Sequence, residues 1–149
     1  MTSTVRVVDR GASRLMARLR ERARAVEVGV LGADAGKQES DGVTVADVAL
    51  WAEFGLGQPR RSWLADWIEA NGPALAERTR IESRAVIAGD RTKAQALGRL
   101  GLWIQGQIQQ RIANGIDPPN AESTIRQKES STPLIDKGQF RSSIATRVV

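Results

Sequence analysis

The sequence predicts a single α+β domain, in which a small mixed or antiparallel sheet packs against several helices that include a long central one. Two segments far apart in the chain, residues 26–31 and 145–149, alternate their side chains as strands do. Helical patterns fill most of the chain between them, and the longest covers about residues 91–114. The 149 residues contain no repeat, and one domain of that length buries roughly two-thirds of the surface that its unfolded chain exposes.

The N-terminal region predicts an amphipathic helix after a short strand-like run at residues 5–8. Asp9 is the expected N-cap, and the helix is expected to continue to about Ala25. Its apolar face consists of Ala12, Leu15, Met16, Leu19 and Ala23. Its basic face consists of Arg14, Arg18 and Arg22. Clustered arginines attract phosphates, so this face predicts contact with nucleic acid or with an acidic partner ring, and a solvated helix face is the alternative.

The net charge of +5 is concentrated at this end of the chain. Residues 1–25 hold seven arginines against Asp9 and Glu21, whereas residues 26–149 carry fifteen basic and fifteen acidic groups that cancel. The basic character is therefore a local property of the N-terminal region.

The middle of the chain predicts a loop and two helices. Residues 32–42 are small and polar and predict an exposed loop, after which residues 43–45 predict a brief strand. A helix is expected over residues 45–54, where Gly55 stops it and begins a sharp turn. The next helix is expected to open at residues 60–62. It carries Trp63, Leu64, Trp67 and Ile68 on one side, and the aromatic pair, four residues apart, is more typical of a core than of a stacking platform.

The second half predicts the two longest helices. Asn71 is a candidate cap and Pro73 a tolerated first-turn residue for a helix that ends at residues 89–90. The helix at residues 91–114 has an apolar stripe formed by Ala94, Leu97, Gly101, Ile104, Ile108 and Ile112. Its interior glycines are Gly98, Gly101 and Gly106. Each costs roughly 1 kcal/mol relative to alanine, which predicts close approach by another element. Residues 115–132 are polar and proline-bearing, with two helical turns at most.

The composition restricts the chemistry. The chain contains no His, Cys or Tyr, which removes the commonest general base, the commonest metal ligand and two covalent nucleophiles. Asp47 and Glu53 lie six residues apart on one predicted helix and do not face each other. No catalytic, cofactor-binding or metal-binding residue is expected, so the chain is not expected to be an enzyme. No apolar run approaches the roughly 20 residues of a membrane span, and no signal core is present at the N-terminus.

Two segments together resemble the tail-completion, or head–tail joining, proteins of tailed bacteriophages, the family that includes the lambda minor tail protein Z. The first motif block covers residues 48–64, where a helix ends in Glu-Phe-Gly and a Pro-Arg element follows. The second covers residues 114–148 and contains Pro-Leu-Ile-Asp-x-Gly-Gln-x-Arg-x-Ser-Ile before a closing strand. The motif residues are Glu53, Phe54, Gly55, Pro59, Arg60, Trp63, Pro133, Leu134, Asp136, Gly138, Phe140, Ser143 and Ile144. Two departures are Lys137, where the family usually has Thr, and residues 61–63, which replace a commoner Arg-Pro-Phe sequence.

The motif residues have a structural interpretation. Glu53 is expected to accept hydrogen bonds or to pair with Arg60 or Arg61 across the glycine turn, which fixes the angle between two helices. Asp136 is expected to cap a helix over residues 137–143 and so to place Phe140 and Ile144 on its buried side. These roles determine the fold, and direct contact with a partner is the alternative.

The resemblance implies a structural virion protein of the neck, at the head-proximal end of the tail, assembled in the host cytoplasm. It implies a homo-oligomeric ring, with a hexamer as the expected form, that docks to tail-tube or tail-terminator proteins and to head-closure or connector proteins. No cofactor and no membrane contact are expected, and DNA would lie close without specific contact. The alternatives are a tail-terminator ring and, from another class, a small basic nucleic-acid-binding protein.

Overall fold

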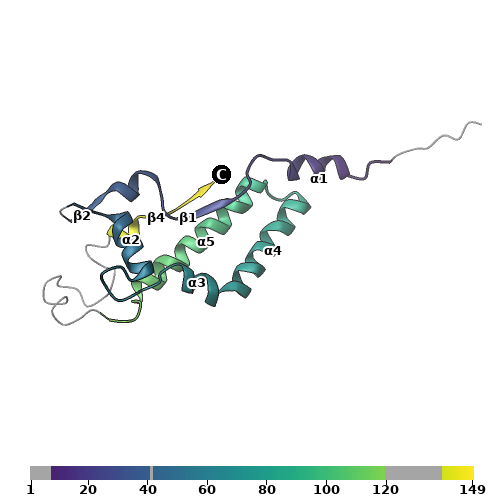
Figure 1. The fold of residues 1–149 in the computed structure, drawn as a ribbon. Helices are drawn as coiled ribbons and strands as arrows, with labels where there is room; N and C mark the ends of the chain where they lie inside the picture. The colour runs from purple at the N-terminus through teal and green to yellow at the C-terminus, as the bar shows by residue number, and fades with distance from the viewer. Residues whose placement is uncertain (1–7, 41, 120–138) are drawn as a thin grey trace, which may run out of the picture.

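The computed structural model describes residues 8–40, 42–119 and 139–149 (Figure 1). The elements in order are α1 (Ala12–Leu19), β1 (Val26–Val30), the 3-10 helix η1 (Gly32–Gly36), β2 (Gln38–Ser40), β3 (Val43–Thr44), α2 (Val45–Phe54), α3 (Ala65–Ala70), α4 (Gly72–Ala88), α5 (Lys93–Ala113), α7 (Gln139–Ser142) and β4 (Ile144–Val148). The predicted class is confirmed: the chain is a small α+β domain with a small antiparallel sheet and several helices, of which α5 is the longest.

The sheet joins the two segments that the sequence predicts as distant strands. β1 and β4 are antiparallel, with Val26 opposite Val148 and Val30 opposite Ile144. The pairing continues beyond β1, because the main-chain N–H groups of Arg24 and Ala25 donate to the carbonyl oxygen of Val149. A second, shorter antiparallel pair is formed by β2 and β3. Residues 32–42, predicted as a loop, therefore contain η1 and a strand, because Thr44 offers β2 a pairing partner.

The core lies where α2, the α3 region, α5 and α7 converge. Its buried cluster consists of Val45, Ala49, Ala52, Trp63, Trp67, Ile108, Ile112, Ile116, Phe140 and Ile144. Phe140 and Ile144 are almost completely buried, as expected for the predicted anchor residues. Trp67 packs edge-on against Trp103 of α5, with the ring centroids 5.9 Å apart. The interpretation of the tryptophans as core residues is confirmed.

The glycines of α5 differ in their surroundings. A Cβ built on Gly101 would collide with the side chain of Thr146 and lie 2.5 Å from Cγ2 of Val26, so α5 approaches the β1–β4 ribbon closely there. The close approach predicted for Gly101 is confirmed. At Gly98 the nearest atom is Cγ2 of Val148 at 3.8 Å, an ordinary contact, and nothing lies within 4 Å of a Cβ on Gly106. The prediction is wrong for these two positions. The buried surface of α5 also rotates along its length, since Ala96 and Leu100, outside the predicted stripe, are buried.

The N-terminal helix is shorter than predicted. α1 ends at Leu19, and the chain then turns so that the Glu21 carboxylate accepts hydrogen bonds from the N–H groups of Lys93 (2.7 Å) and Ala94 (3.3 Å). This carboxylate satisfies two N–H groups that the first turn of α5 leaves without helical partners. Arg22 consequently lies beyond the helix, and the chain becomes extended where it pairs with β4.

Several helix starts differ from the prediction. The helix expected from residues 60–62 begins at Ala65, because residues 62–65 bind the side chain of Glu53 instead. Asn71 does not cap α4 with its side chain, which donates to the carbonyl oxygen of Trp67 at the end of α3. Asp9 accepts hydrogen bonds from the N–H groups of Gly11 and Ser13, although the N-cap residue itself is Gly11. The strand-like run predicted at residues 5–8 is described only at Val8, which is not in a strand. The turns expected within residues 120–132 and the capping role of Asp136 lie outside the described residues.

Candidate assembly site around Glu53 and the outer face of α2

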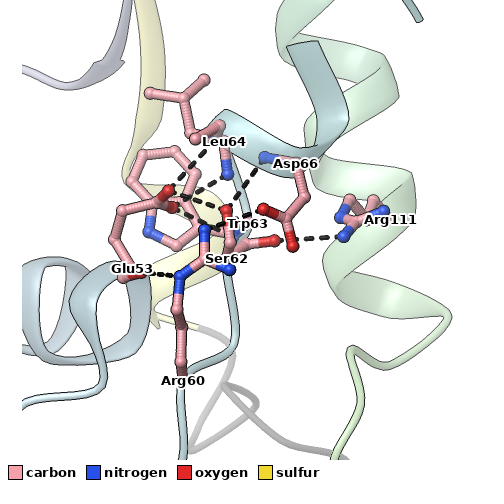
Figure 2. A network of polar contacts seen from close by, with 8 residues as sticks. Glu53, Arg60, Ser62, Trp63, Leu64, Asp66 and Arg111 are labelled. Atoms are coloured by element: carbon pink, nitrogen blue, oxygen red, sulfur yellow. Dashed lines mark hydrogen bonds and ion pairs between the residues drawn. The ribbon is translucent and has the colours of Figure 1, made fainter. Parts of the chain in front are cut away.

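Glu53 stands in the last turn of α2 and turns its carboxylate into the protein (Figure 2). Oε1 accepts hydrogen bonds from Oγ of Ser62 (2.7 Å) and from the N–H of Ala65 (3.1 Å). Oε2 accepts from the N–H groups of Trp63 and Leu64, each at 3.1 Å. Four donors fill the roughly four lone-pair positions of a carboxylate, so its desolvation is compensated by hydrogen bonds. We call this arrangement of Glu53 with residues 62–65 the Glu53 hub.

The Glu53 hub sets the start of α3. Glu53 accepts hydrogen bonds from the N–H groups of residues 63–65, just before and at the start of α3. N–H groups at the start of a helix have no hydrogen-bond partner within the helix itself. Oγ of Ser62 extends the hydrogen-bond network into α3, because it accepts a hydrogen bond from the N–H of Asp66 at 3.0 Å. One carboxylate at the end of α2 therefore fixes the position of α3, which confirms the hydrogen-bonding role expected for Glu53.

The ion pair that was the other expectation for Glu53 is not formed. Nε of Arg60 donates to the main-chain oxygen of Glu53 (3.1 Å), and its Nη2 donates to Oδ1 of Asp66 (2.8 Å). The carboxylate of Glu53 cannot also bind Arg60 because its positions are filled from residues 62–65. The Arg60 guanidinium holds the pKa of Asp66 below its ordinary value through this hydrogen bond.

Two arginines join the Glu53 hub and the residue before it to the rest of the fold through part-buried hydrogen bonds. Nη2 of Arg111 on α5 donates to the carbonyl oxygen of Ser62 at 3.1 Å (Figure 2). Arg61 is buried, and its guanidinium donates to the carbonyl oxygens of Pro118 (2.7 Å) and Pro119 (3.1 Å). Burial lowers the pKa of Arg61. The predicted pairing of Arg61 with Glu53 is wrong because Arg61 points toward the chain that follows α5.

Gly55 makes the turn between α2 and the hub. Its φ of 72° is in the left-handed region, where glycine is favoured. A Cβ at this position would also lie 3.0–3.2 Å from the main chain and Cβ of Arg60. The glycine of the Glu-Phe-Gly motif is thus required both by conformation and by space.

The two motif blocks meet in the core. The rings of Trp63 and Phe140 pack edge to face, with centroids 5.4 Å apart and planes at 84°. Nε1 of Trp63 donates to the carbonyl oxygen of Ala49 on α2 at 3.0 Å. Ser143, which is also buried, donates from Oγ to the carbonyl oxygen of Gln139 at 2.9 Å. The described part of the second block is therefore packed on the first.

The outer face of α2 is apolar and exposed. Leu50, Trp51 and Phe54 on α2 have exposed fractions of 51%, 38% and 65%, and Leu56, just after the helix, is 55% exposed. The opposite face of the same helix is buried through Val45, Ala49, Ala52 and Glu53. A helix that is apolar on all sides is normally covered on all sides. We call the four exposed residues the α2 patch.

Apart from Gly55, which is half-buried in the turn, the motif residues divide into three groups. Glu53, Trp63, Phe140, Ser143 and Ile144 are buried in the network and the core. Phe54, Pro59 and Arg60 are exposed. Pro133, Leu134, Asp136 and Gly138 lie outside the described residues. Only Phe54 of the exposed group belongs to an apolar patch.

The predicted basic face is divided. Arg14 is exposed on α1, whereas Arg18 is half-buried and donates from Nη1 to the carbonyl oxygen of Ile87 at 3.2 Å. The guanidinium of Arg18 also lies where a Cβ on Gly89 would stand, so it fixes α1 to the end of α4. Arg22 is exposed but follows the helix. The three arginines therefore do not form one face of a helix.

Sequence reasoning did not identify several structural residues. Glu82 is buried on α4 and binds three arginines, at 3.5 Å (Arg78), 3.2 Å (Arg91) and 3.3 Å (Arg99). Arg78 has the four-residue helical spacing to Glu82, but the contacts of Arg91 and Arg99 with Glu82, and that of Arg111 with Ser62, have no local sequence signal. The capping boxes at Thr44 with Asp47 and at Thr92 with Gln95 do have one, because both pairs have the three-residue spacing of that motif.

No family model, curated protein or solved structure matches the chain. Within the described ranges there is no group of three or more acidic residues arranged to hold a metal ion. In the same part of the chain, no helix has both the length and the apolarity needed to cross a membrane.

Proposed function

We propose that the chain is a structural virion assembly protein of the tail-completion type, which works at the neck of a tailed phage by oligomerising and by docking to tail and head-closure proteins. The α2 patch carries this proposal. Three large apolar side chains on α2 and Leu56 just after it are exposed, although the other face of the helix is already packed, and such patches mark contact sites between proteins. The chemistry of such a site is shape and apolar contact, which needs no cofactor.

The resemblance to the tail-completion family supports the same proposal. Its two motif blocks are 77 residues apart at Trp63 and Phe140, yet these two rings are in contact. Glu53 and Gly55, the residues that define the first block, fix the turn after α2 and therefore the position of Phe54 and Leu56 in the patch. The motif thus holds an exposed surface in a defined shape.

Docking to tails tests the proposal. Purified chain is mixed with tails from the phage or prophage that encodes it, and negative-stain electron microscopy records density at the head-proximal end. Phe54→Ser is expected to abolish that density because it removes the most exposed side chain of the α2 patch. Leu102→Ser on α5 is the matched control, since Leu102 is 63% exposed and lies outside the patch. Tails that bind neither the wild-type chain nor the control would contradict the proposal.

A second candidate function is nucleic-acid binding through the N-terminal arginines. It is favoured by one observation: Arg10, Arg14, Arg20, Arg22 and Arg24 are all exposed. Tight binding to duplex DNA that falls steeply with salt, with a slope set by the number of phosphates contacted, would support it. Weak binding together with stable rings would exclude it.

A further inference from the structure

A second exposed apolar surface lies at the other end of the molecule from the α2 patch. Met16 and Leu19 on α1 are 47% and 48% exposed, and Ile87 at the end of α4 is 56% exposed. Leu19 and Ile87 line one cavity of about 220 Å³ between α4 and α5, and half-buried Leu15 lies beside Ile87 in the adjoining hollow. We call Leu15, Met16, Leu19 and Ile87 the α1 patch. Figure 1 shows α1 and α2 at opposite ends of the domain.

α1 is held in place although its apolar face is uncovered. None of its eight residues is buried. Arg18 fixes it to Ile87 and Gly89 at the end of α4, and Glu21 fixes the following turn to the first residues of α5. An isolated helix of eight residues is not stable in water. The anchors at Arg18 and Glu21 therefore help to keep α1 folded, and an apolar partner on its exposed face would stabilise it further.

The two ends carry opposite charge. Residues 8–25 contain six arginines against Asp9 and Glu21, a net charge of +4. Residues 32–70, which include α2 and the Glu53 hub, contain seven carboxylates against Lys37, Arg60 and Arg61, a net charge of −4. Arg111, which donates to Ser62, and Arg141 on α7, which contacts α2, bring the charge of this end to −2. Two α1 ends repel each other and so do two α2 ends, whereas an α1 end attracts an α2 end.

We infer that the α1 patch of one copy docks on the α2 patch of the next copy of this chain. The inference rests on the proposed function and deepens it, because it names the two surfaces through which the copies associate. A contact between two different surfaces is head-to-tail, and a head-to-tail contact closes into a ring when its rotation allows. Each copy in a closed ring then covers both of its exposed apolar patches.

Cross-linking tests the inference directly because the chain contains no cysteine. A double variant with Met16→Cys and Phe54→Cys is treated with a short bismaleimide and analysed on a denaturing gel. The expected result is a ladder of covalent dimers, trimers and higher multimers, because each copy would link to the copies on both sides. Met16→Cys alone and Phe54→Cys alone are expected to stay monomeric on the gel.

A double variant with Met16→Cys and Leu102→Cys is the matched control. Leu102 has an exposed fraction close to that of Phe54, 63% against 65%, so the two cysteines have similar access to the reagent. No ladder is expected for this pair. All three positions are exposed, and unchanged thermal unfolding of each variant shows that the fold is retained.

Four outcomes would overturn the inference. A ladder that is absent while light scattering shows an oligomer would place the contact elsewhere and leave the proposed function standing. Dimers of Met16→Cys alone would mean that α1 pairs with itself. Protection of the cysteine at position 16 by duplex DNA, with the cysteine at position 54 still reactive, would assign α1 to nucleic acid. A chain that is monomeric at every concentration and forms no ladder would contradict both the inference and the proposed function.

Discussion

Ser62 donates its hydroxyl hydrogen to Oε1 of Glu53 at 2.7 Å and accepts, on the same oxygen, the N–H of Asp66 at 3.0 Å. The serine therefore connects a carboxylate at the end of α2 to the first turn of α3. Through Arg111, whose Nη2 reaches the Ser62 carbonyl oxygen, the same residue is tied to α5. This one network fixes the relative positions of α2, α3 and α5, and the α2 patch lies on the first of these helices and the turn after it.

Replacing the Glu53 carboxylate by an amide tests the Glu53 hub. In Glu53→Gln the amide nitrogen would face N–H donors, so two acceptor positions are lost in a buried site. We expect the free energy of unfolding to fall by about 2–4 kcal/mol, since buried donors are left without acceptors. Urea denaturation measures the change. Glu69→Gln on the exposed side of α3 is the control and is expected to stay within about 0.5 kcal/mol of the wild type. Equal effects of the two changes would show that the Glu53 hydrogen bonds do not stabilise the fold.

Two glycines of the turn allow the cost of a left-handed backbone to be distinguished from the cost of a steric clash. Gly55 and Gly57 have φ of 72° and 69°, but only a Cβ on Gly55 would meet Arg60. We expect Gly57→Ala to cost about 1–2 kcal/mol because alanine disfavours the left-handed region. Gly55→Ala should cost more than this, since the main chain of Arg60 must also move. Thermal unfolding of both variants gives the comparison, and equal losses would rule out a steric role for Gly55.

Two glycines of α5 are expected to respond with opposite sign. Gly101→Ala places a Cβ against Thr146 and Val26 of the ribbon, so we expect a loss of about 1–3 kcal/mol from overpacking. Gly106→Ala meets nothing within 4 Å on an exposed surface and should stabilise the helix by up to about 1 kcal/mol. Chemical denaturation of both variants tests the pair. A stabilising Gly101→Ala would contradict the close packing of α5 on the ribbon.

The capping box of α2 leads to a prediction about the pKa of Asp47. The hydroxyl of Thr44 donates to Asp47, and this hydrogen bond is the main cause that lowers the pKa of Asp47 below its ordinary value. Asp47 thus has a lower pKa in the folded chain than in the unfolded chain. The ionised Asp47 therefore stabilises the fold above the pKa of an unfolded aspartate, and this stabilisation is lost as the pH falls through the pKa of Asp47 in the folded chain.

Thr44→Val is expected to raise the pKa of Asp47 toward its ordinary value, as followed by NMR of the side-chain carboxyl carbon. Thr92→Val removes the hydroxyl of the other capping box and should leave this titration unchanged. A pKa of Asp47 that is the same in Thr44→Val and the wild type would show that the hydroxyl is not its cause.

Much of the fold followed from local pattern. The alternation at residues 26–31 and 145–149 predicted both strands of the ribbon, and Gly55 and Gly89 ended helices where the pattern indicated. The local pattern predicted the wrong helix end where a side chain binds a group that is distant in the sequence. α1 is shorter than its apolar spacing suggests because Glu21 binds α5, whose first residue is 72 positions away along the chain.

The candidate site was predictable only in part. Glu53 was expected to accept hydrogen bonds, but its donors were not identified, because main-chain N–H groups leave no mark in the sequence. The exposed side of α2 was also not foreseen. A ten-residue helix with eight apolar residues is compatible with burial on every side, and only the arrangement of the neighbouring elements leaves Leu50 and Phe54 exposed.

The mass of the chain in solution tests the proposed assembly function most directly. Size-exclusion chromatography with light scattering is run on the full chain over a series of concentrations. A discrete multiple of 16.2 kDa that persists on dilution, and that appears as rings by electron microscopy, is the expected result. A constant mass of 16.2 kDa at every concentration, unchanged when purified tails are added, would contradict it.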